Sequence, residues 1–400
     1  MRSALLLTVA LALAAPAPAG GPAAPAVPLG PVPPAELKPN TWTPVKIDAP
    51  LPADLKGARW ETTDGFSYSV YRAKTGTVLL RTGIDCKAAG YCPGYYTNTT
   101  VEWDPVTDKG TVVEIAAWGG GSYGKGKLLP AFKENPTPSP RHTYDSICYV
   151  GEEDAVYMMH GANWKTCLGE GVPQDAKDAL QLDHNSVWKY SFAEKKWTRI
   201  DGSVRQFWNE YRASNFEAHM RHWPAGGRLL YFNSGANCHA EFDLKTKKWE
   251  KIELKGKSPM SLYEARSAWD AKRGLWVFRH GPQACTYNPA TREFAALPEL
   301  YPMPNPAPKD EKDPRRGCQG IAYNSKHDVY FASGPTGDDT YVLEPGKSAW
   351  TNLKCGDVKL GSWRYLQYDP KTDVTVLSTH LAAFKFRYVP EKPAAGGEGK

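Results

Sequence analysis

The sequence lacks several features that mark common classes of protein. Its 49 basic and 43 acidic residues are interspersed, and no basic stripe of the kind that binds a phosphate backbone occurs. No phosphate-binding loop of the Gly-x-x-x-x-Gly-Lys-(Ser/Thr) type is present, which argues against a P-loop NTPase. The longest apolar run, Ala4–Ala15, is shorter than the ~20 residues that a membrane-spanning helix needs. The sequence therefore predicts neither a nucleic-acid partner nor a membrane span.

The first 19 residues have the composition of a secretory signal. Arg2 precedes the apolar run, and Ala17-Pro18-Ala19 matches the small-residue pattern of a cleavage site before Gly20. We expect residues 1–19 to be removed as a bacterial-type signal peptide and the mature protein to be secreted or periplasmic. Residues 20–40 are rich in Pro and Ala, which predicts an extended linker.

What the sequence does contain is a repeat of short strand-like segments. In the stretch 215–254, four segments of about five residues are separated by turns with Gly, Pro or Lys, as in a small antiparallel sheet. An aromatic residue ends the first segment in six copies, at Tyr71, Tyr149, Trp223, Trp269, Tyr323 and Tyr368. A Gly follows 12 positions later in four of these copies. One such sheet cannot bury both of its faces, so the copies are expected to pack against one another.

A second spacing recurs in the outer half of the unit. Asp104, Ser191, Asp243, Asn288 and Glu344 each stand six positions before Gly110, Trp197, Trp249, Phe294 and Trp350. The sixth unit lacks its last strand, and Thr41–Ile47 resembles that strand, with Trp42 in the aromatic position. We therefore predict an all-β fold, a six-bladed β-propeller of four-stranded antiparallel blades, over residues 41–389. The N-terminal strand closes the ring, and residues 390–400 form a disordered tail.

The repeat resembles the kelch-type β-propellers of the galactose oxidase-like superfamily. The matching features are the Gly after the second strand, the Trp of the fourth strand, and an aromatic residue followed by Asp or Asn in the third strand. That third-strand pair occurs as Trp103-Asp104, Phe242-Asp243 and Tyr287-Asn288. Most copies have a single Gly where the kelch pattern usually has two. The copper oxidases of this group use an adjacent Tyr-His pair, and the sequence contains no such dipeptide.

The long insertions all fall between second and third strands or between blades. In a four-stranded blade these connections share one face, here called the loop-rich face, and the short hairpin turns share the other, the hairpin face. The insertions are Ile84–Asn98, Gly119–Pro140, Ala162–His184 (in which Gln174–Leu182 suits a short helix), Gly202–Ser214 and Leu300–Arg315. Because binding residues concentrate on elaborated loops of a rigid scaffold, we expect function on the loop-rich face.

Polar and aromatic side chains gather at the strand ends beside this face. Arg recognises carboxylates or sulfates through its forked guanidinium, and Trp and Tyr rings stack on sugar faces. The candidate ligand-binding residues are Arg81, His142, Tyr144, His160, Glu217, His219, Arg266, Arg279, His280, Arg316, Trp363 and Arg364. For each Arg or His, a hydrogen bond at the surface or between blades is the alternative role. We predict a monomeric binding module for an extracellular glycan, another anionic molecule or a protein partner.

An enzyme, such as a metal-assisted polysaccharide lyase or hydrolase, is the alternative function. Two to four His side chains from different blades can bind a divalent metal near the axis of a propeller, and the available set is His142, His160, His219, His280 and His380, but no local ligand spacing marks them as a site. His219 and His222 lie three apart in one strand and are expected to point to opposite faces. The sequence identifies no catalytic residue and predicts no cofactor, with a divalent metal left open.

Export into an oxidising compartment favours disulfides over a metal cluster for the eight cysteines. Cys86 and Cys92 flank five residues of one loop and are expected to be bonded. Cys238 and Cys285 occupy equivalent loops of neighbouring blades, which suggests a bridge between blades. The remaining connectivity is left open by the sequence.

Overall fold

The computed structural model of the chain describes most of the repeat region and parts of the insertions. The described residues are 33–51, 53, 59–61, 69–85, 99–115, 118–121, 125–128, 135–139, 141, 143, 145–159, 174–184, 186–208, 218–233, 238–262, 265–300, 320–334, 337–360, 365–379 and 382–390. Within these ranges, no helix is long and apolar enough to cross a lipid bilayer.

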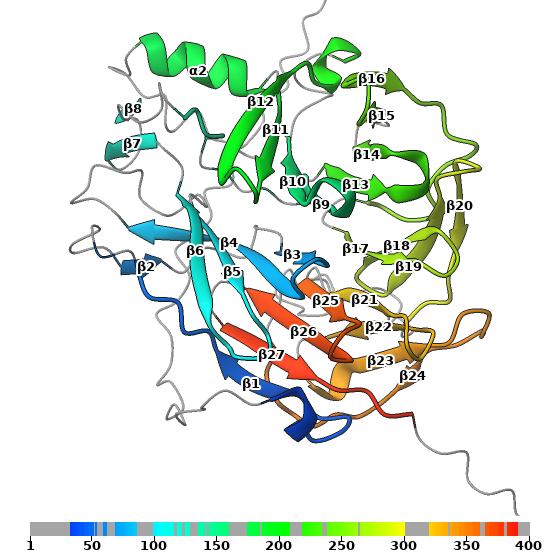
Figure 1. Cartoon of the computed structure of the whole chain (residues 1–400). Coiled ribbons are helices and arrows are strands. Elements are labelled where there is room, and N and C mark those ends of the chain that lie inside the picture. Colours follow the sequence, from blue (N-terminus) through cyan, green and yellow to red (C-terminus); the bar gives the residue numbers. More distant parts are fainter. Residues whose placement is uncertain are drawn as a thin grey trace, which may run out of the picture.

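Six antiparallel sheets surround a central axis, which confirms the predicted all-β, six-bladed propeller (Figure 1). Blade one consists of β3 (Ser69–Arg72), β4 (Thr77–Asp85), β5 (Thr99–Trp103) and β6 (Gly110–Ile115), with β2 (Arg59–Glu61) added beside β4. Blade two consists of β9 (Ile147–Val150), β10 (Ala155–Met158), β11 (Ser186–Ser191) and β12 (Lys196–Asp201). Blade three consists of β13 (His219–Trp223), β14 (Arg228–Asn233), β15 (Cys238–Asp243) and β16 (Lys248–Lys251).

The other three blades repeat this plan. Blade four consists of β17 (Arg266–Asp270), β18 (Leu275–His280), β19 (Gln283–Asn288) and β20 (Glu293–Ala296). Blade five consists of β21 (Ile321–Asn324), β22 (Val329–Ser333), β23 (Thr340–Leu343) and β24 (Thr351–Asn352). Blade six consists of β25 (Tyr365–Asp369), β26 (Val374–Thr379), β27 (Ala382–Phe386) and the N-terminal β1 (Thr43–Lys46). The first strand of each blade lies innermost, beside the first strands of its neighbours (Figure 1).

The turn between the third and fourth strands explains the second repeated spacing. The Asp243 carboxylate accepts hydrogen bonds from the backbone N–H groups of Lys245 and Thr246 at 2.9 and 2.7 Å. Asn288 caps the corresponding turn of blade four in the same way. Lys247, four residues after the cap, adopts a left-handed φ of 58°. A capped turn that ends in a left-handed residue closes the hairpin, so the fourth strand's aromatic residue follows at a fixed distance.

The hydrophobic core is divided into six clusters, one at each interface between neighbouring blades. Between blades two and three, for example, Tyr157 and Val187 pack in one cluster with Tyr231 and Phe242, and all four side chains are 0% exposed. A blade that is apolar on both faces needs a neighbour on each side. A closed ring supplies two neighbours to every blade.

The N-terminal strand closes the ring, as predicted. β1 pairs antiparallel with β27 as the outermost strand of blade six, and Figure 1 shows the two side by side. Trp42 is 4% exposed, and its ring centroid lies 4.8 Å from that of Phe386. Its indole N–H donates to Thr340 Oγ1 of blade five at 2.8 Å. The strand therefore ties blade six to blade five as well as completing its own sheet.

The segment after β1 continues onto blade one. The Asp48 N–H donates to the Asp108 carbonyl at 2.9 Å, and the Asp48 carbonyl accepts from the Gly110 N–H at 2.7 Å. Gly110 occupies the position where other blades have an aromatic residue, and a Cβ there would lie 2.7 Å from Ala49 Cβ. Close approach of the N-terminal segment thus requires the glycine. Lys385 of blade six also forms a buried ion pair with Asp108, 2.6 Å from Nζ to Oδ1.

The packed chain begins before residue 41. Leu37 is 1% exposed and belongs to the core cluster between blades six and one. The Asn40 side chain exchanges two hydrogen bonds with the backbone of Val389, at 2.8 and 2.9 Å. The end of the segment that the sequence predicts to be a linker is therefore packed on the propeller.

The insertions of blades one and two contain secondary structure of their own. The helix α2 (Gln174–His184) confirms the short helix expected there, and a hairpin of β7 (Trp118–Gly121) and β8 (Lys125–Leu128) was not predicted. α2 contacts both β8 and β11, and Figure 1 shows it at the edge of the ring above β7 and β8. Asp183 near its end is buried, where it accepts a hydrogen bond from Ser139 Oγ at 2.6 Å and pairs with Arg141. The two insertions thus pack on one another on the loop-rich face.

The structure has a free thiol at one of the two positions where the sequence suggests a bridge between blades. Cys285 is free and fully buried, so the predicted bond between Cys238 and Cys285 is wrong. The side chain packs in the core between blades three and four, where burial raises the pKa of the thiol to about 12. A neutral, enclosed thiol is a poor nucleophile and a poor partner for oxidation. Cys86 and Cys92 lie outside the described residues, and their bond stays a prediction.

Replacing Trp42 by Ala is expected to lower the free energy of unfolding by about 3–5 kcal/mol, because it leaves a cavity at the point of closure. Trp42→Phe keeps a ring against Phe386 and loses the hydrogen bond to Thr340, so its expected loss is smaller, about 1–2 kcal/mol. Urea unfolding followed by circular dichroism measures both variants. Wild-type stability of Trp42→Ala would contradict closure through this residue.

Candidate functional site

Five of the candidate ligand-binding residues lie in the described part of the chain: Arg81, His219, Arg266, Arg279 and His280. Arg81 is 3% exposed and forms an ion pair with Glu114 in the same blade at 2.6 Å. Arg279 is 0% exposed and donates to the carbonyl oxygens of Gly320 and Ser333 at 2.9 and 2.7 Å, which joins blade four to blade five. His280 is partly buried at the end of β18. The two arginines therefore have structural partners.

His219 and Arg266 belong to a buried charge cluster around Asp145. The Asp145 Oδ2 atom lies 3.0 Å from His219 Nδ1 and 3.2 Å from Arg221 Nη2. It also lies 3.7 Å from Arg266 Nη1, and the Arg266 guanidinium is 4.2 Å from the centre of the Tyr365 ring. These contacts join blade four to blades two and six, which are not its neighbours. They therefore cross the axis, at the strand ends nearest the loop-rich face.

The charge cluster is buried and is held by electrostatic attraction. Burial by itself would raise the pKa of Asp145, but the two guanidinium groups and His219 lower it to about 2. The carboxylate is thus ionised at neutral pH and matched by adjacent cations, as a buried charge requires. The cluster therefore forms a buried polar core toward the loop-rich end of the central channel, the space around the axis inside the six innermost strands.

The histidines give no metal centre in the described residues. The His219 Nε2 atom donates to the Leu262 carbonyl oxygen at 2.6 Å and Nδ1 faces Asp145, so neither nitrogen is turned toward a ligand site. No three His, Cys, Asp or Glu side chains of these ranges are grouped to hold a metal ion. His142, His160 and His380 lie outside them.

The other predicted site residues also lie outside the described residues: His142, Tyr144, His160, Glu217, Arg316, Trp363 and Arg364. Their ligand-binding role stays a prediction.

A cavity of about 420 Å³ lies at the other end of the channel, on the hairpin face. It is lined by the first strand of every blade and by the turns that follow, at Ala73, Gly151, Pro224, Ala271, Ser325 and Pro370. Because these turns join first to second strands, the mouth of the cavity is on the hairpin face. We call this space the central cavity.

The aromatic residues that mark the repeat form the wall of the central cavity. Five of the six line it: Tyr71, Tyr149, Trp269, Tyr323 and Tyr368. The sixth, Trp223, packs against the core cluster between blades three and four. One position repeated in each innermost strand generates a ring around the axis. The repeated aromatic spacing, which in the sequence indicates packing between the copies, thus places these residues in the wall of a cavity.

The tyrosine hydroxyls of this wall are held by carboxylates of the hairpin turns. The pairs within one blade are Tyr149–Asp154, Tyr323–Asp328 and Tyr368–Asp373, at 2.9, 2.8 and 3.1 Å. Each Asp stands five residues after its Tyr and has a left-handed φ of 44°, 53° or 58°. Tyr71 has Gly76 at that position and instead donates to Asp369 of blade six at 2.5 Å. These bonds fix the orientation of the rings.

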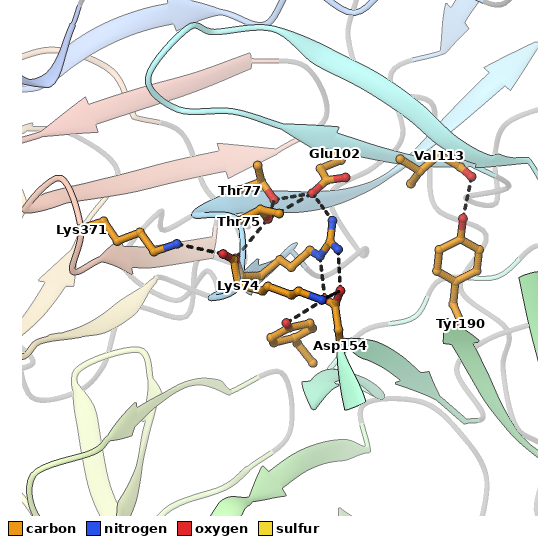
Figure 2. A network of polar contacts seen from close by, with 10 residues as sticks. Lys74, Thr75, Thr77, Glu102, Val113, Asp154, Tyr190 and Lys371 are labelled. Atoms are coloured by element: carbon orange, nitrogen blue, oxygen red, sulfur yellow. Dashed lines mark hydrogen bonds and ion pairs between the residues drawn. The ribbon is translucent and has the colours of Figure 1, made fainter. Parts of the chain in front are cut away.

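The same carboxylates bind cations of the neighbouring blade. Arg72 of blade one donates to Asp154 of blade two through Nε and Nη2 at 2.8 and 2.7 Å. Lys74 adds a third contact to Asp154 at 3.0 Å, and its carbonyl accepts from Lys371 of blade six (Figure 2). Figure 2 also shows Tyr190 of blade two donating to the carbonyl of Val113 in blade one.

The remaining pairs continue this belt around the ring. They are Arg273–Asp328 at 2.7 Å between blades four and five, and Lys326–Asp373 at 2.7 Å between blades five and six. We call these turn ion pairs, with Arg72–Asp154, the turn belt. The rim of the central cavity is therefore braced by contacts between blades.

Two titratable side chains, His222 and Glu152, stand at one side of the central cavity. His222 Nε2 lies 3.5 Å from Glu152 Oε2. Burial lowers the pKa of His222, and Glu152 and Glu153 act in the opposite direction. Arg221 and Cys148 also line the cavity; Arg221 is balanced by Asp145, and burial raises the pKa of the Cys148 thiol to about 12.

The sequence did not indicate a cavity at the hairpin face. Long insertions point to the loop-rich face, whereas the described cavity opens among short turns. The available signal was the aromatic spacing itself, since a residue repeated at the end of all six innermost strands must encircle the axis.

No protein-family model matches the chain, and no characterised protein shows significant similarity to it. The resemblance to kelch-type propellers therefore stays a prediction, whereas the six-bladed architecture is shown by the sheet topology.

Asp154→Asn is expected to lower the free energy of unfolding at pH 7 by about 1 kcal/mol, because it removes a partly solvated ion pair without changing the turn. Arg72 holds the pKa of Asp154 below its usual range. The stabilisation is therefore present above the ordinary Asp pKa of about 3.9 and is lost as the pH falls below it. Urea midpoints from pH 7 to pH 2.5 should show the wild-type and variant curves converging in acid.

The exposed Asp357, which has no ion-pair partner among the described residues, supplies the control Asp357→Asn, whose curve should follow that of the wild type. A constant difference between Asp154→Asn and the wild type down to pH 2.5 would contradict the assigned ion pair.

Proposed function

We propose that the protein is a binding module that holds a carbohydrate in the central cavity. The observation that carries the proposal is a cavity of about 420 Å³ on the propeller axis with Tyr or Trp from five blades in its wall. Ligand pockets are usually concave, mostly apolar and of about 300–1,000 Å³, with a few polar groups. The central cavity has these properties.

The chemistry of the wall favours a sugar. Tyr and Trp rings offer flat apolar surfaces for the faces of a pyranose, and the hydroxyl groups of the sugar need polar partners at its edge. Glu152, His222, Ser267 and Gln367 supply such partners among the lining residues. Fixed rings lose little entropy when a ligand binds, because the turn carboxylates already hold the tyrosine hydroxyls.

An anionic ligand has less support at this site. Arg221 is the arginine of the cavity lining, and its charge is balanced by Asp145 at 3.2 Å. The Glu152 carboxylate, whose side chain is 61% exposed, would repel an anion at the mouth. A neutral glycan fits the described charges better. A protein partner that inserts an apolar side chain is the competing occupant.

The test is a printed array of neutral mono- and oligosaccharides, followed by calorimetry with the best binder. Trp269→Ala removes one ring of the wall and is expected to weaken binding roughly tenfold, about 1.4 kcal/mol. Trp208→Ala, which removes a partly exposed Trp outside the cavity lining, is the matched control and should bind as the wild type does. An array without any bound sugar, or equal binding by Trp269→Ala, would refute the proposal.

We also propose that the protein acts after export, in the periplasm or outside the cell. The support is Met1–Ala19, with its apolar segment and cleavage pattern. Expression of the full chain in a bacterial host, followed by N-terminal sequencing, should give Gly20 as the first residue of the exported protein. Recovery of uncleaved protein from the cytoplasm alone would contradict export.

A further inference from the structure

His222 is a buried polar side chain in the wall of the central cavity. It is 7% exposed, and within the described residues its Nε2 atom has no hydrogen-bond partner. The backbone around it is fixed, since its carbonyl oxygen accepts from Trp276 Nε1 of blade four at 3.1 Å. The atom is therefore free of protein partners among the described residues, and a ligand in the cavity can supply one.

Glu152 lies near His222 in the lining of the central cavity. Its Oε2 atom is 3.5 Å from His222 Nε2, beyond the length of a good hydrogen bond. The next residue, Glu153, is used differently: it accepts from Tyr157 OH at 2.7 Å and pairs with Lys247 at 3.5 Å, and it does not line the cavity. Of these two adjacent carboxylates, only Glu152 faces the central cavity.

We infer that His222 and Glu152 together are the specificity-determining pair of the central cavity, and that they recognise one edge of the sugar by hydrogen bonds to its hydroxyl groups. This inference rests on the proposed function and names the residues that discriminate between sugars. An imidazole nitrogen donates a hydrogen bond to a hydroxyl oxygen or accepts one from a hydroxyl group. The carboxylate accepts a hydrogen bond from the same or the adjacent hydroxyl. The aromatic wall provides affinity for many sugars, whereas this pair selects the position of the hydroxyl groups.

Selection of this kind has a clear physical basis. A site built to bond a hydroxyl rejects an analogue without it, because the polar groups of the site are then left unpaired. Loss of one hydrogen bond to a neutral group corresponds to about three- to tenfold in affinity, and loss of one to a carboxylate to roughly ten- to a hundredfold. Stacking on the rings gives no such dependence on a single hydroxyl.

The experiment uses the full-length mature protein and the methyl glycoside that binds the wild type most tightly. Calorimetry compares this glycoside with its monodeoxy analogues, each lacking one ring hydroxyl. The wild type is expected to bind at least one analogue about three- to tenfold more weakly or worse. His222→Phe keeps a ring of similar size. It should bind the parent glycoside as weakly as the wild type binds that analogue, and it should bind the glycoside and the analogue with equal affinity.

Glu152→Gln is the second variant, and its exposed side chain makes loss of folding no concern. It should lose discrimination at the same or the adjacent hydroxyl, whereas Glu153→Gln should retain the wild-type profile. Wild-type discrimination by both His222→Phe and Glu152→Gln, with binding still weakened in Trp269→Ala, would overturn this inference and leave the carbohydrate site standing. Failure of the wild type to bind any glycoside would refute the site and the inference together.

Discussion

The fold depends on one constraint, the pairing of β1 with β27, because each blade is apolar on both faces and needs two neighbours. The six core clusters all lie between blades, so an open array would leave two of these faces in water. Pairing of the first strand with the last joins segments about 340 positions apart, from Thr43 opposite Lys385 to Lys46 opposite Ala382. Trp42, Gly110 and the buried pair of Lys385 with Asp108 reinforce this seam from both sides.

Closure also shapes the channel, because it fixes the six innermost strands around one axis. Toward the loop-rich face, the cluster of Asp145, Arg221 and Arg266 spans the axis and brings together blades that are not neighbours. Toward the hairpin face, the aromatic residues end short of the axis and leave the central cavity. The turn belt then braces the mouth. Within the described residues, a buried polar cluster therefore spans the axis toward one face, and an aromatic cavity opens toward the other.

Much of this architecture follows from spacing alone. Blade number and strand order were predictable because each turn of fixed length requires a cap such as Asp243 and a left-handed residue such as Lys247 at set positions. Closure was predictable because Thr41–Ile47 resembles the strand that the sixth unit lacks. Even the exception in the pattern, Gly110, has a local cause in the approach of Ala49. Such features depend on a few neighbouring residues and therefore leave a mark in the sequence.

The site was less predictable, because it depends on side chains from blades distant in the sequence. Arg279 suits a ligand-binding role by residue type, yet its partners are the carbonyl oxygens of Gly320 and Ser333 in the next blade. The free Cys285 shows the same limit, since equivalent positions in neighbouring blades do not imply contact. The sequence predicts of His222 only that it points to the face of its strand opposite His219, and its place in the cavity depends on the assembled ring.

Hydrogen–deuterium exchange of the native protein, resolved by mass spectrometry, tests the closed ring most directly. The amides of β1 should be as protected as those of β16, the outermost strand of a blade made from one continuous stretch of chain, and β27 should be as protected as β15. Exchange of β1 and β27 at the rate of unstructured chain, while β15 and β16 remain protected, would contradict closure of the ring and with it the cavity on its axis.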